Sequence, residues 1–567
     1  MKIWHGFFLF GTLLLLSACG EPYEATGSGG LICAPKSCAE MDYSCGTLVN
    51  NCGAVVYCGD CGTSEVCRRG QCIDAPLGDG DQDLGDGDGD GSGGQGGDIL
   101  EQLQRLEGVE YRELQAPEDP ERPWPEEGRV LLITLDQPEN HDAPQLGRFG
   151  HRMVLYHRDE NAPLVLYQLG YGLGILQGEE NWGFRHELTE LLGANQLIVE
   201  HRFFDESIAE NPRWENLTIQ QSARDSNRIV ETLKPIYRGP WIGTGASKGG
   251  MTNLFHVAAF ADDLAGIIPY VAPFIFGQED VRYIGFLEQI GPLDGVCAQQ
   301  VKDRSIEMIQ RSREAALFVR SLLPEAQQSL EEIEALIALN VLGFRWRFWQ
   351  FFGTPEGCAA LPQGGEPMEA LAPWFFQDPE RLLWPQQYNS SIGPYSYQVA
   401  NEFGAPARDF SFLFEVFDES NIDLGLIDNS RDVPWPVEPA FNPQPKLAIN
   451  DLIRLSGTRI IALYGAWDPW TAGKITLPDH PSNRIFTAAK RAHSVSLLDL
   501  TEEERAEVFM LLGQWTGQPL AQSALSAQAA FAPERLNGIE HQRLMDFQRQ
   551  AEEQAKRYFF LQELQKR

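Results

Sequence analysis

Short apolar runs alternate with helical patterns through much of the chain. The runs of strand length are 163–168, 197–200, 241–244, 267–271, 459–464 and 484–487. Between several of them, the spacing of apolar positions predicts helices over 184–192, 217–237 and 249–260. Strands that alternate with helices are typical of βαβ units, so the pattern predicts an α/β fold on a mostly parallel sheet.

The alternation stops between about 274 and 455 and then resumes. This interval is rich in Trp, Phe and Pro, and its apolar residues follow helical spacing, as in 344–352. It predicts a large, mainly helical cap over the carboxyl edge of the sheet. The globular part then consists of a first core segment (98–273), the cap (274–455) and a second core segment (456–567), which ends in a docking helix over 540–567.

The first 19 residues have the pattern of an export signal. Lys2 precedes an apolar run, 7–16, that is too short to span a bilayer, and Leu16-Ser-Ala-Cys19 follows it. This ending resembles the bacterial lipobox, which implies that Cys19 is lipidated. The protein would then be anchored to a bacterial membrane outside the cytoplasm, at the cell surface or in the periplasm. An ordinary signal peptide with an incidental cysteine is the alternative.

A cysteine-rich module is predicted over 20–76, because eight of the 11 cysteines lie between Cys33 and Cys72. An even, dense set in an exported chain favours four disulfides, although the sequence does not choose among the possible pairings. Half of a zinc site at Cys58-Gly-Asp-Cys61 is disfavoured by the absence of histidine nearby. The module either binds cell-wall or polysaccharide material or acts as a rigid spacer.

Two further cysteines, Cys297 and Cys358, lie in the predicted cap. Export favours a disulfide between them, and two reduced, buried thiols are the alternative.

Residues 77–97 are almost entirely Gly and Asp and predict a flexible, self-repelling linker. Its Asp86, Asp88 and Asp90 match the start of a calcium loop, but Gly97 stands where a bidentate Glu is needed. We therefore assign neither a metal nor a cofactor. The formal net charge of −35 argues against nucleic-acid partners and anionic membrane surfaces, so the lipid is the predicted contact with a membrane.

The segment Gly243-Thr-Gly-Ala-Ser247-Lys-Gly249-Gly carries the main candidate chemistry. A predicted strand leads into a tight turn and then into a predicted helix, which is the setting of a nucleophile elbow. Glycines on both sides of the serine let strand and helix approach closely. We interpret Ser247 as the nucleophile; the alternative is a glycine-rich turn with a bystander serine.

A serine nucleophile needs a base and an acid that orients the base, and in this fold they follow it in the order acid, then histidine. Asp468 leaves the predicted strand 459–464, and His493 follows the last predicted strand, so we assign them as acid and base. His480 precedes that strand and ranks second. His256 lies within the elbow helix and His541 in the terminal helix.

An oxyanion hole needs two backbone donors. The N–H of Lys248, which follows the nucleophile, is one. The loop Gly170-Tyr171-Gly172 after strand 163–168 offers the other through Tyr171, unless it is a plain glycine turn.

The motifs Gln168-Leu-Gly-Tyr-Gly, Glu200-His-Arg and Ser247-Lys-Gly-Gly resemble those of the PS-10 family of serine peptidases, family S37. The surroundings of Asp468 and His493 match as well, and the resemblance covers about residues 100–515. It implies an α/β-hydrolase fold and a secreted exopeptidase that removes short peptides from free N-termini, often after proline. The lipobox and the cysteine-rich module lie outside the resemblance.

Three carboxylates are candidates for binding the substrate amino group: Glu179, Glu180 and Glu200. Glu179 and Glu180 could equally form a solvated turn. For Glu200-His201-Arg202, a buried ion pair that supports the elbow is preferred over a substrate contact.

Two functions from other classes compete with a peptidase. A lipase or carboxylesterase would use the same triad, because the triad does not distinguish amide from ester substrates. A non-catalytic surface-binding protein is disfavoured by the complete set of Ser247, Asp468 and His493.

Overall fold

The computed structural model describes residues 98–520, except 121, 177, 377–381, 384–392, 424–439 and 456, and short pieces between residues 36 and 74. The predicted signal sequence with Cys19, the 77–97 linker and the 540–567 helix lie outside these residues. Within the described part, no helix has the length and apolar character needed to cross a bilayer.

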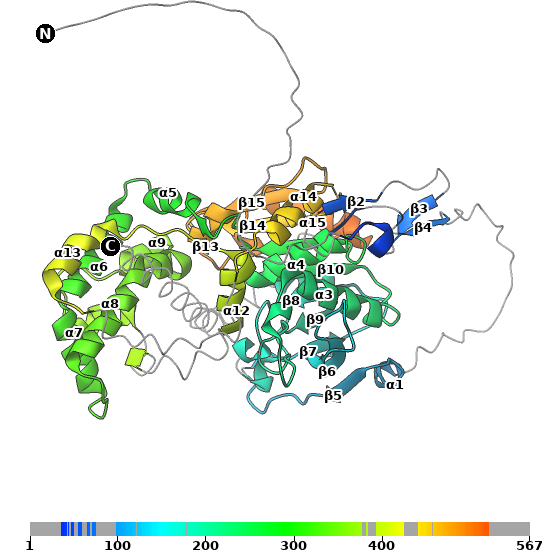
Figure 1. Ribbon diagram of the computed structural model, residues 1–567, viewed down its shortest axis with the longest axis horizontal. Helices are drawn as coiled ribbons and strands as arrows, with labels where there is room; N and C mark the ends of the chain where they lie inside the picture. Colours follow the sequence, from blue (N-terminus) through cyan, green and yellow to red (C-terminus); the bar gives the residue numbers. More distant parts are fainter. Residues whose placement is uncertain are drawn as a thin grey trace, which may run out of the picture.

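A nine-stranded sheet forms the centre of the molecule, in the order β15-β14-β11-β10-β8-β9-β7-β6-β5 (Figure 1). Its strands are β5 (Val109–Glu113), β6 (Arg129–Pro138), β7 (Arg148–His157), β8 (Leu164–Gln168), β9 (Asn195–Val199), β10 (Trp241–Ala246), β11 (Gly266–Tyr270), β14 (Ile461–Gly465) and β15 (Arg484–Ala488). Neighbours from β15 to β9 are parallel, whereas β7, β6 and β5 are added antiparallel. The predicted mostly parallel sheet is confirmed.

Helices cover both faces of this sheet because its strands are apolar on both sides. Side chains that alternate along the strands enter two separate clusters, as Leu164 and Leu166 do on one face and Val165 on the other. The helices on the first face are α3 (Ile219–Leu233), α4 (Lys248–Ala259) and α14 (Gln444–Leu455). Those on the second face are α2 (Glu187–Leu192) and α15 (Glu502–Thr516). A short α1 (Ile99–Gln104) packs at the start of the domain.

Between β11 and β14 the chain leaves the sheet and forms the cap, which lies at one end of the sheet domain in Figure 1. Its helices are α5 (Arg282–Gln289), α6 (Val296–Gln310), α7 (Ser312–Leu322), α8 (Leu330–Arg347), α9 (Pro355–Ala360), α10 (Met368–Phe375), α12 (Gly393–Gln398) and α13 (Phe414–Ser420). Two π-helical segments, η5 (Phe348–Phe352) and η7 (Val399–Phe403), follow α8 and α12. The strands β12 (Glu279–Asp280) and β13 (Ala405–Pro406) pair beside them.

The cap has a hydrophobic core of its own, distinct from the two clusters at the sheet. A disulfide joins Cys297 of α6 to Cys358 of α9, so the expected cap disulfide is confirmed. Helix α14, which falls inside the predicted interval 274–455, instead packs Ile449, Leu452 and Ile453 against the sheet core. The part with a separate core therefore ends before α14.

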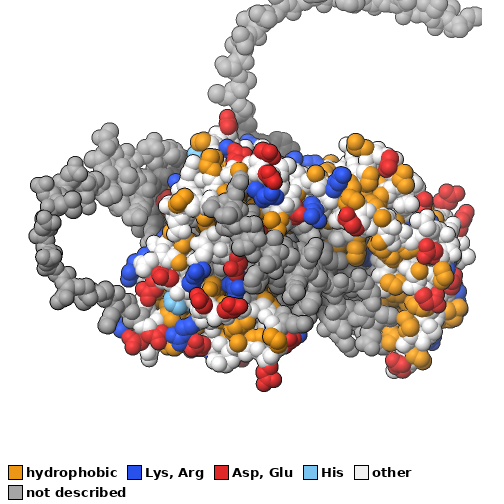
Figure 2. All heavy atoms as spheres, turned by 180° about the vertical axis from the view of Figure 1, so that it is seen from behind, with side chains coloured by type: hydrophobic (Ala, Val, Ile, Leu, Met, Phe, Trp, Pro, Cys, Tyr) orange, Lys and Arg blue, Asp and Glu red, His pale blue; other side chains and the backbone are white. Residues whose placement is uncertain are grey.

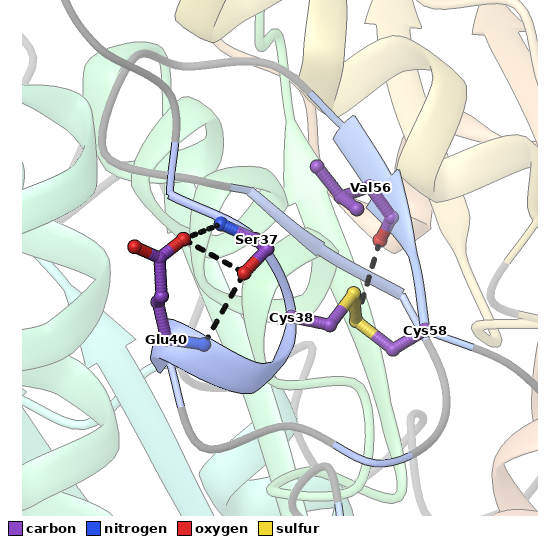
Figure 3. Close-up of a disulfide and its surroundings, with 5 residues drawn as sticks. All are labelled: Ser37, Cys38, Glu40, Val56 and Cys58. Atoms are coloured by element: carbon purple, nitrogen blue, oxygen red, sulfur yellow. Dashed lines mark hydrogen bonds between the residues drawn. A yellow bond between two sulfur atoms is a disulfide. The ribbon is translucent and has the colours of Figure 1, made fainter.

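The cysteine-rich module contributes two described hairpins, β1 (Thr47–Val49) with β2 (Val55–Tyr57) and β3 (Glu65–Arg68) with β4 (Gln71–Asp74). Cys38 and Cys58 form a disulfide, shown in Figure 3. Next to it, Ser37 and Glu40 exchange hydrogen bonds that close a short turn. The hairpin of β1 and β2 contacts α14, so this part of the module lies against the sheet domain.

On the face of the molecule shown in Figure 2, acidic side chains lie among basic and hydrophobic ones. Although the sequence has a large negative net charge, Lys and Arg side chains lie among the acidic ones on the described part of this face.

Candidate active site

Ser247 stands at the tight turn between β10 and α4, as the elbow motif predicts. Its backbone has φ 54° and ψ −121°, a strained conformation for a residue with a side chain. The Ser247 N–H donates to the carbonyl of Tyr270 at the end of β11, 2.8 Å away, which ties the turn to the neighbouring strand. The turn presents Ser247 at the carboxyl edge of the sheet, where the N-terminus of α4 favours negative charge.

The glycines around Ser247 are required by close backbone contacts. A Cβ atom on Gly245 would lie 2.4 Å from the carbonyl oxygen of Gln168, and one on Gly249 would lie 2.1 Å from the same atom. Neither approach is possible for a larger residue without movement of β8. The Gly-x-Ser-x-Gly spacing therefore reflects the packing of the elbow on the neighbouring strand.

Asp468 and His493 meet at the same edge of the sheet. Asp468 follows β14 and His493 follows β15, and the Nδ1 atom of His493 lies 2.7 Å from Oδ2 of Asp468. The other carboxylate oxygen accepts from the N–H of Trp470 at 3.0 Å. Both side chains are buried. The pair holds the histidine ring so that its Nε2 is left for chemistry, and that atom has no hydrogen-bond partner among the described residues.

His480, the second-ranked base, is not part of this arrangement. Its Nδ1 accepts from the N–H of Ser482, 3.2 Å away, in the turn before β15. His256 pairs with Asp263 at 2.8 Å on the far end of α4. Because His256 also has an aspartate partner, what distinguishes His493 is that its pair with Asp468 lies at the carboxyl edge of the sheet, where Ser247 stands.

The cap contacts the catalytic loop through its backbone. The N–H of His493 donates to the carbonyl of Gln350 in η5, 2.9 Å away. The ring of Trp470, two residues after Asp468, also contacts the cap. Its centre lies 5.0 Å from the ring centre of Trp346 in the cap and 6.4 Å from that of His493. π-Helical segments are frequent at functional sites, and here η5 holds the backbone of His493 in the loop after β15. No pattern in the sequence indicated this contact.

The loop predicted to supply the second oxyanion donor lies directly against the elbow. Gly170 has φ +75°, and a Cβ there would lie 2.5 Å from the N atom of Gly249. The Tyr171 carbonyl accepts from the His201 N–H at 2.8 Å, which fixes the far side of the loop. The Lys248 N–H is the first of α4, so it has no carbonyl partner within its own helix. The loop of Tyr171 therefore lies against the elbow that carries Ser247 and Lys248, and the two oxyanion donors stay a prediction.

Glu200 lies inside the protein, which corrects its assignment as a candidate for binding the substrate amino group. Arg152 of β7 donates to both of its carboxylate oxygens at 2.9 and 3.0 Å, and the Leu173 N–H and Ser207 hydroxyl donate to them as well. Burial raises the pKa of Glu200 and Arg152 opposes this shift. With every oxygen engaged in the interior, Glu200 braces the loop after β8, in line with the preferred ion-pair interpretation.

Arg202 forms a second buried ion pair, with a partner that the sequence did not indicate. Its guanidinium donates to both oxygens of Asp225 in α3, at 2.6 and 2.9 Å, and to the backbone carbonyls of Glu139 and Asn216. Burial alone would raise the pKa of Asp225, but Arg202 and His141 together hold that pKa below its usual range. Asp225 lies 23 residues from Arg202 with no local pattern to connect them, so only the fold reveals the pair.

The two other predicted carboxylates lie in η3 (Glu179–Asn181). Glu179 receives two hydrogen bonds from Arg112 of β5, the strand at the opposite edge of the sheet from β15. Glu180 is exposed and has no ion pair within the described part of the chain. Of the three carboxylates, Glu180 is therefore the one that remains open to a ligand.

Comparison with known proteins gives the family of this chain. The family model of the PS-10 peptidase S37 family matches residues 118–550. The chain is 27% identical to the prolyl tri/tetrapeptidyl aminopeptidase of Streptomyces mobaraensis over 427 residues, which covers 74% of this chain and 85% of that protein.

Solved α/β-hydrolase structures are also similar. A proline iminopeptidase from Mycobacterium smegmatis matches with a TM-score of 0.29 and 13% identity, covering 68% of this chain and 98% of that one. A putative lipase from Acinetobacter baumannii matches with a TM-score of 0.28 and 11% identity, covering 74% and 95%. Neither score carries an argument about activity. The family model, by contrast, matches most of the chain, and this serine-type peptidase therefore belongs to the PS-10 peptidase S37 family.

Proposed function

We propose that this peptidase is an exported, lipid-anchored exopeptidase that releases short peptides from free N-termini, preferentially after proline. The observation that carries the catalytic part is the 2.7 Å hydrogen bond between His493 and Asp468 at the edge of the sheet that presents Ser247. The name of the Streptomyces mobaraensis relative supports the specificity for proline and for chain ends.

The proposed reaction proceeds through an acyl-enzyme. His493 Nε2 takes the proton of the Ser247 hydroxyl as its oxygen attacks the peptide carbonyl, and Asp468 stabilises the imidazolium that forms. The oxyanion is held by the N–H groups of Lys248 and Tyr171. His493 then protonates the departing amine, and a water molecule, activated by the same histidine, releases the N-terminal fragment from Ser247.

The cap supports a preference for chain ends. The cap has its own core and contacts the loops that carry Asp468 and His493, so it encloses one side of the site. A roofed site admits an end of a peptide more easily than a folded loop, which must both enter and leave.

Recognition of a free N-terminus requires a group that binds ammonium, and a carboxylate does so through a charge-assisted hydrogen bond. Glu180 is our candidate, because Glu179 is paired with Arg112 and Glu200 is buried in an ion pair. Glu180→Gln should raise KM for a free tripeptide and leave an N-acetylated one unchanged. Glu179→Gln is the matched control, with little expected change on either substrate.

The deciding experiment compares one proline-containing tripeptide anilide, free and N-acetylated, with a matched ester. The free peptide should be cleaved after proline, and acetylation should lower kcat/KM roughly tenfold to a hundredfold. Equal rates on the two peptides would contradict N-terminal recognition. Rapid turnover of the ester alone would favour a carboxylesterase.

Labelling with a fluorophosphonate tests the nucleophile separately. The folded protein should be modified at Ser247, and Ser247→Ala should abolish labelling and lower kcat by about 10⁴-fold or more. Hydrolysis that persists at the wild-type rate in this variant would assign the nucleophile elsewhere.

Anchoring is tested by partition into detergent. The native protein should separate with the membrane fraction and carry lipid on Cys19, and Cys19→Ala should stop correct processing. A native protein found wholly in the culture medium would contradict the anchor but leave the peptidase proposal intact.

A further inference from the structure

The residue after the nucleophile, Lys248, has an unusual environment for a lysine. Its side chain is 1% exposed, although lysine is rarely buried unless it is paired with an acid. Among the described residues it forms no ion pair with a carboxylate. Its amino group instead donates to the backbone carbonyl of Gly170, in the loop beside the elbow. An amine buried in this way costs free energy, so its retention calls for a reason in the site itself.

Three aromatic rings surround this amino group. The Nζ atom lies 4.7 Å from the ring centre of Phe204, 5.5 Å from that of Tyr171 and 5.9 Å from that of Phe403. The rings of Tyr171 and Phe204 meet edge to face, with centres 5.8 Å apart. Phe403 is the last residue of η7 and packs in the core cluster of the sheet domain, so the three rings form one aromatic cage on that domain.

The bond to Gly170 bears on the oxyanion hole through the geometry of the peptide group. In a trans peptide the carbonyl of one residue and the N–H of the next point in opposite directions within one plane. The carbonyl of Gly170 and the N–H of Tyr171 belong to the same plane. A donor that holds the carbonyl on one side therefore fixes the direction of the Tyr171 N–H on the other.

We infer that the Lys248 side chain is a positioning residue that orients the Gly170–Tyr171 peptide as an oxyanion donor. The inference rests on the proposed catalytic mechanism and adds a role for a side chain to it. In this arrangement Lys248 acts twice, through its backbone N–H as a donor and through its amino group as the support for the second donor.

Lys248→Met tests this role, because methionine has a similar length, retains the backbone N–H and lacks the amine. With one oxyanion donor released, kcat should fall on the order of a hundredfold while KM stays within about threefold. The inhibition constant of a peptidyl boronic acid, whose adduct places an oxygen in the oxyanion hole, should rise by a similar factor. The midpoint of thermal unfolding should be unchanged or higher, because a buried amine without an acid is removed.

Lys446→Met is the matched control. Lys446 of α14 is also 1% exposed, donates to a backbone carbonyl, that of Phe403, and lies 5.6 Å from the Phe403 ring, but it does not contact the elbow. Its variant should keep kcat and boronate inhibition within about threefold of the wild type. Lys248→Gln, which retains an N–H donor on a shorter chain, should recover part of the lost kcat, and it takes over the test if Lys248→Met does not fold.

The outcomes separate this inference from the proposed function. A wild-type protein that does not react with a fluorophosphonate would contradict the triad itself. A reactive wild type together with an unchanged kcat in Lys248→Met would contradict only the role of Lys248. A fall in kcat without weaker boronate binding, or an equal effect in Lys446→Met, would also overturn the inference, because the loss would then not arise at the oxyanion.

Discussion

The Nδ1 atom of His493 lies 2.7 Å from Oδ2 of Asp468, although the two residues are 25 positions apart and follow different strands. Their strands, β14 and β15, are parallel neighbours, so their carboxyl ends meet at one edge of the sheet. A hydrogen bond of this kind selects the histidine tautomer that leaves Nε2 ready to accept a proton.

Replacing Asp468 by Asn should therefore lower kcat by about 10⁴-fold without unfolding the protein, because the amide favours the wrong tautomer of His493. The measurement is kcat on a proline-containing peptide anilide. His480→Ala serves as the control and should change kcat by less than about threefold. A loss of activity in His480→Ala comparable to that in His493→Ala would reverse the assignment of the base.

The buried pair of Arg202 and Asp225 should matter for stability. Asp225→Ala leaves the fully buried guanidinium without its partner, so the free energy of unfolding should fall by about 3–5 kcal/mol. Asp142→Ala breaks a pair of similar length, 2.7 Å to Arg224, that is partly exposed, and should cost no more than about 1 kcal/mol. Urea denaturation of the two variants gives the comparison, and equal losses would show that burial does not set the contribution.

Stability should depend on pH through Glu187. Burial raises its pKa to about 7, against the hydrogen bonds that it accepts from Tyr270 and from the Leu497 N–H. A carboxyl whose pKa is raised in the folded state binds its proton more tightly there. Its contribution to stability is therefore complete below its unfolded pKa and is lost as the pH rises through about 7.

Glu187→Gln should remove this dependence, so that the unfolding temperature of the wild type falls relative to the variant between pH 5 and pH 8. Glu503→Gln, at an exposed position of α15, is the control and should keep the wild-type profile. Parallel profiles for wild type and Glu187→Gln would exclude Glu187 as the titrating group.

The disulfide between Cys297 and Cys358 closes a loop between residues 61 positions apart inside the cap. Replacing both cysteines by serine should reduce stability by up to about 4 kcal/mol, because the unfolded chain gains freedom. The cap has its own core, so the loss should appear first as faster proteolysis within 297–358. Unchanged proteolysis in the reduced protein would show that the packing of the cap is sufficient without the bond.

The sequence by itself determined the elements whose signal is local. Apolar runs with turn residues predicted the parallel strands β8, β9, β10, β11, β14 and β15, and the glycines around Ser247 predicted the elbow. The order of strands along the chain then selected Asp468 and His493 from many candidates. These features depend on periodicity and on backbone conformation, which neighbouring residues encode.

The antiparallel strands β6 and β7 were not predicted. The apolar run at 130–135 in β6 was missed, whereas charged and polar residues interrupt the apolar pattern of β7. Arg152 of β7 is an example, and its carboxylate partner, Glu200, is 48 positions away. Such a side chain is interpretable only when the partner that neutralises it is known. The same limit applied to Glu200 itself, whose place in the interior ruled out the substrate contact.

Only the tertiary structure decided which distant groups meet. It brought Gln350 of the cap to the backbone of His493, Asp225 to Arg202, and the amino group of Lys248 to the carbonyl of Gly170. It also placed α14 on the sheet rather than in the cap. Each of these contacts joins segments that the chain separates and depends on how whole elements pack, so no local pattern of residues could specify it.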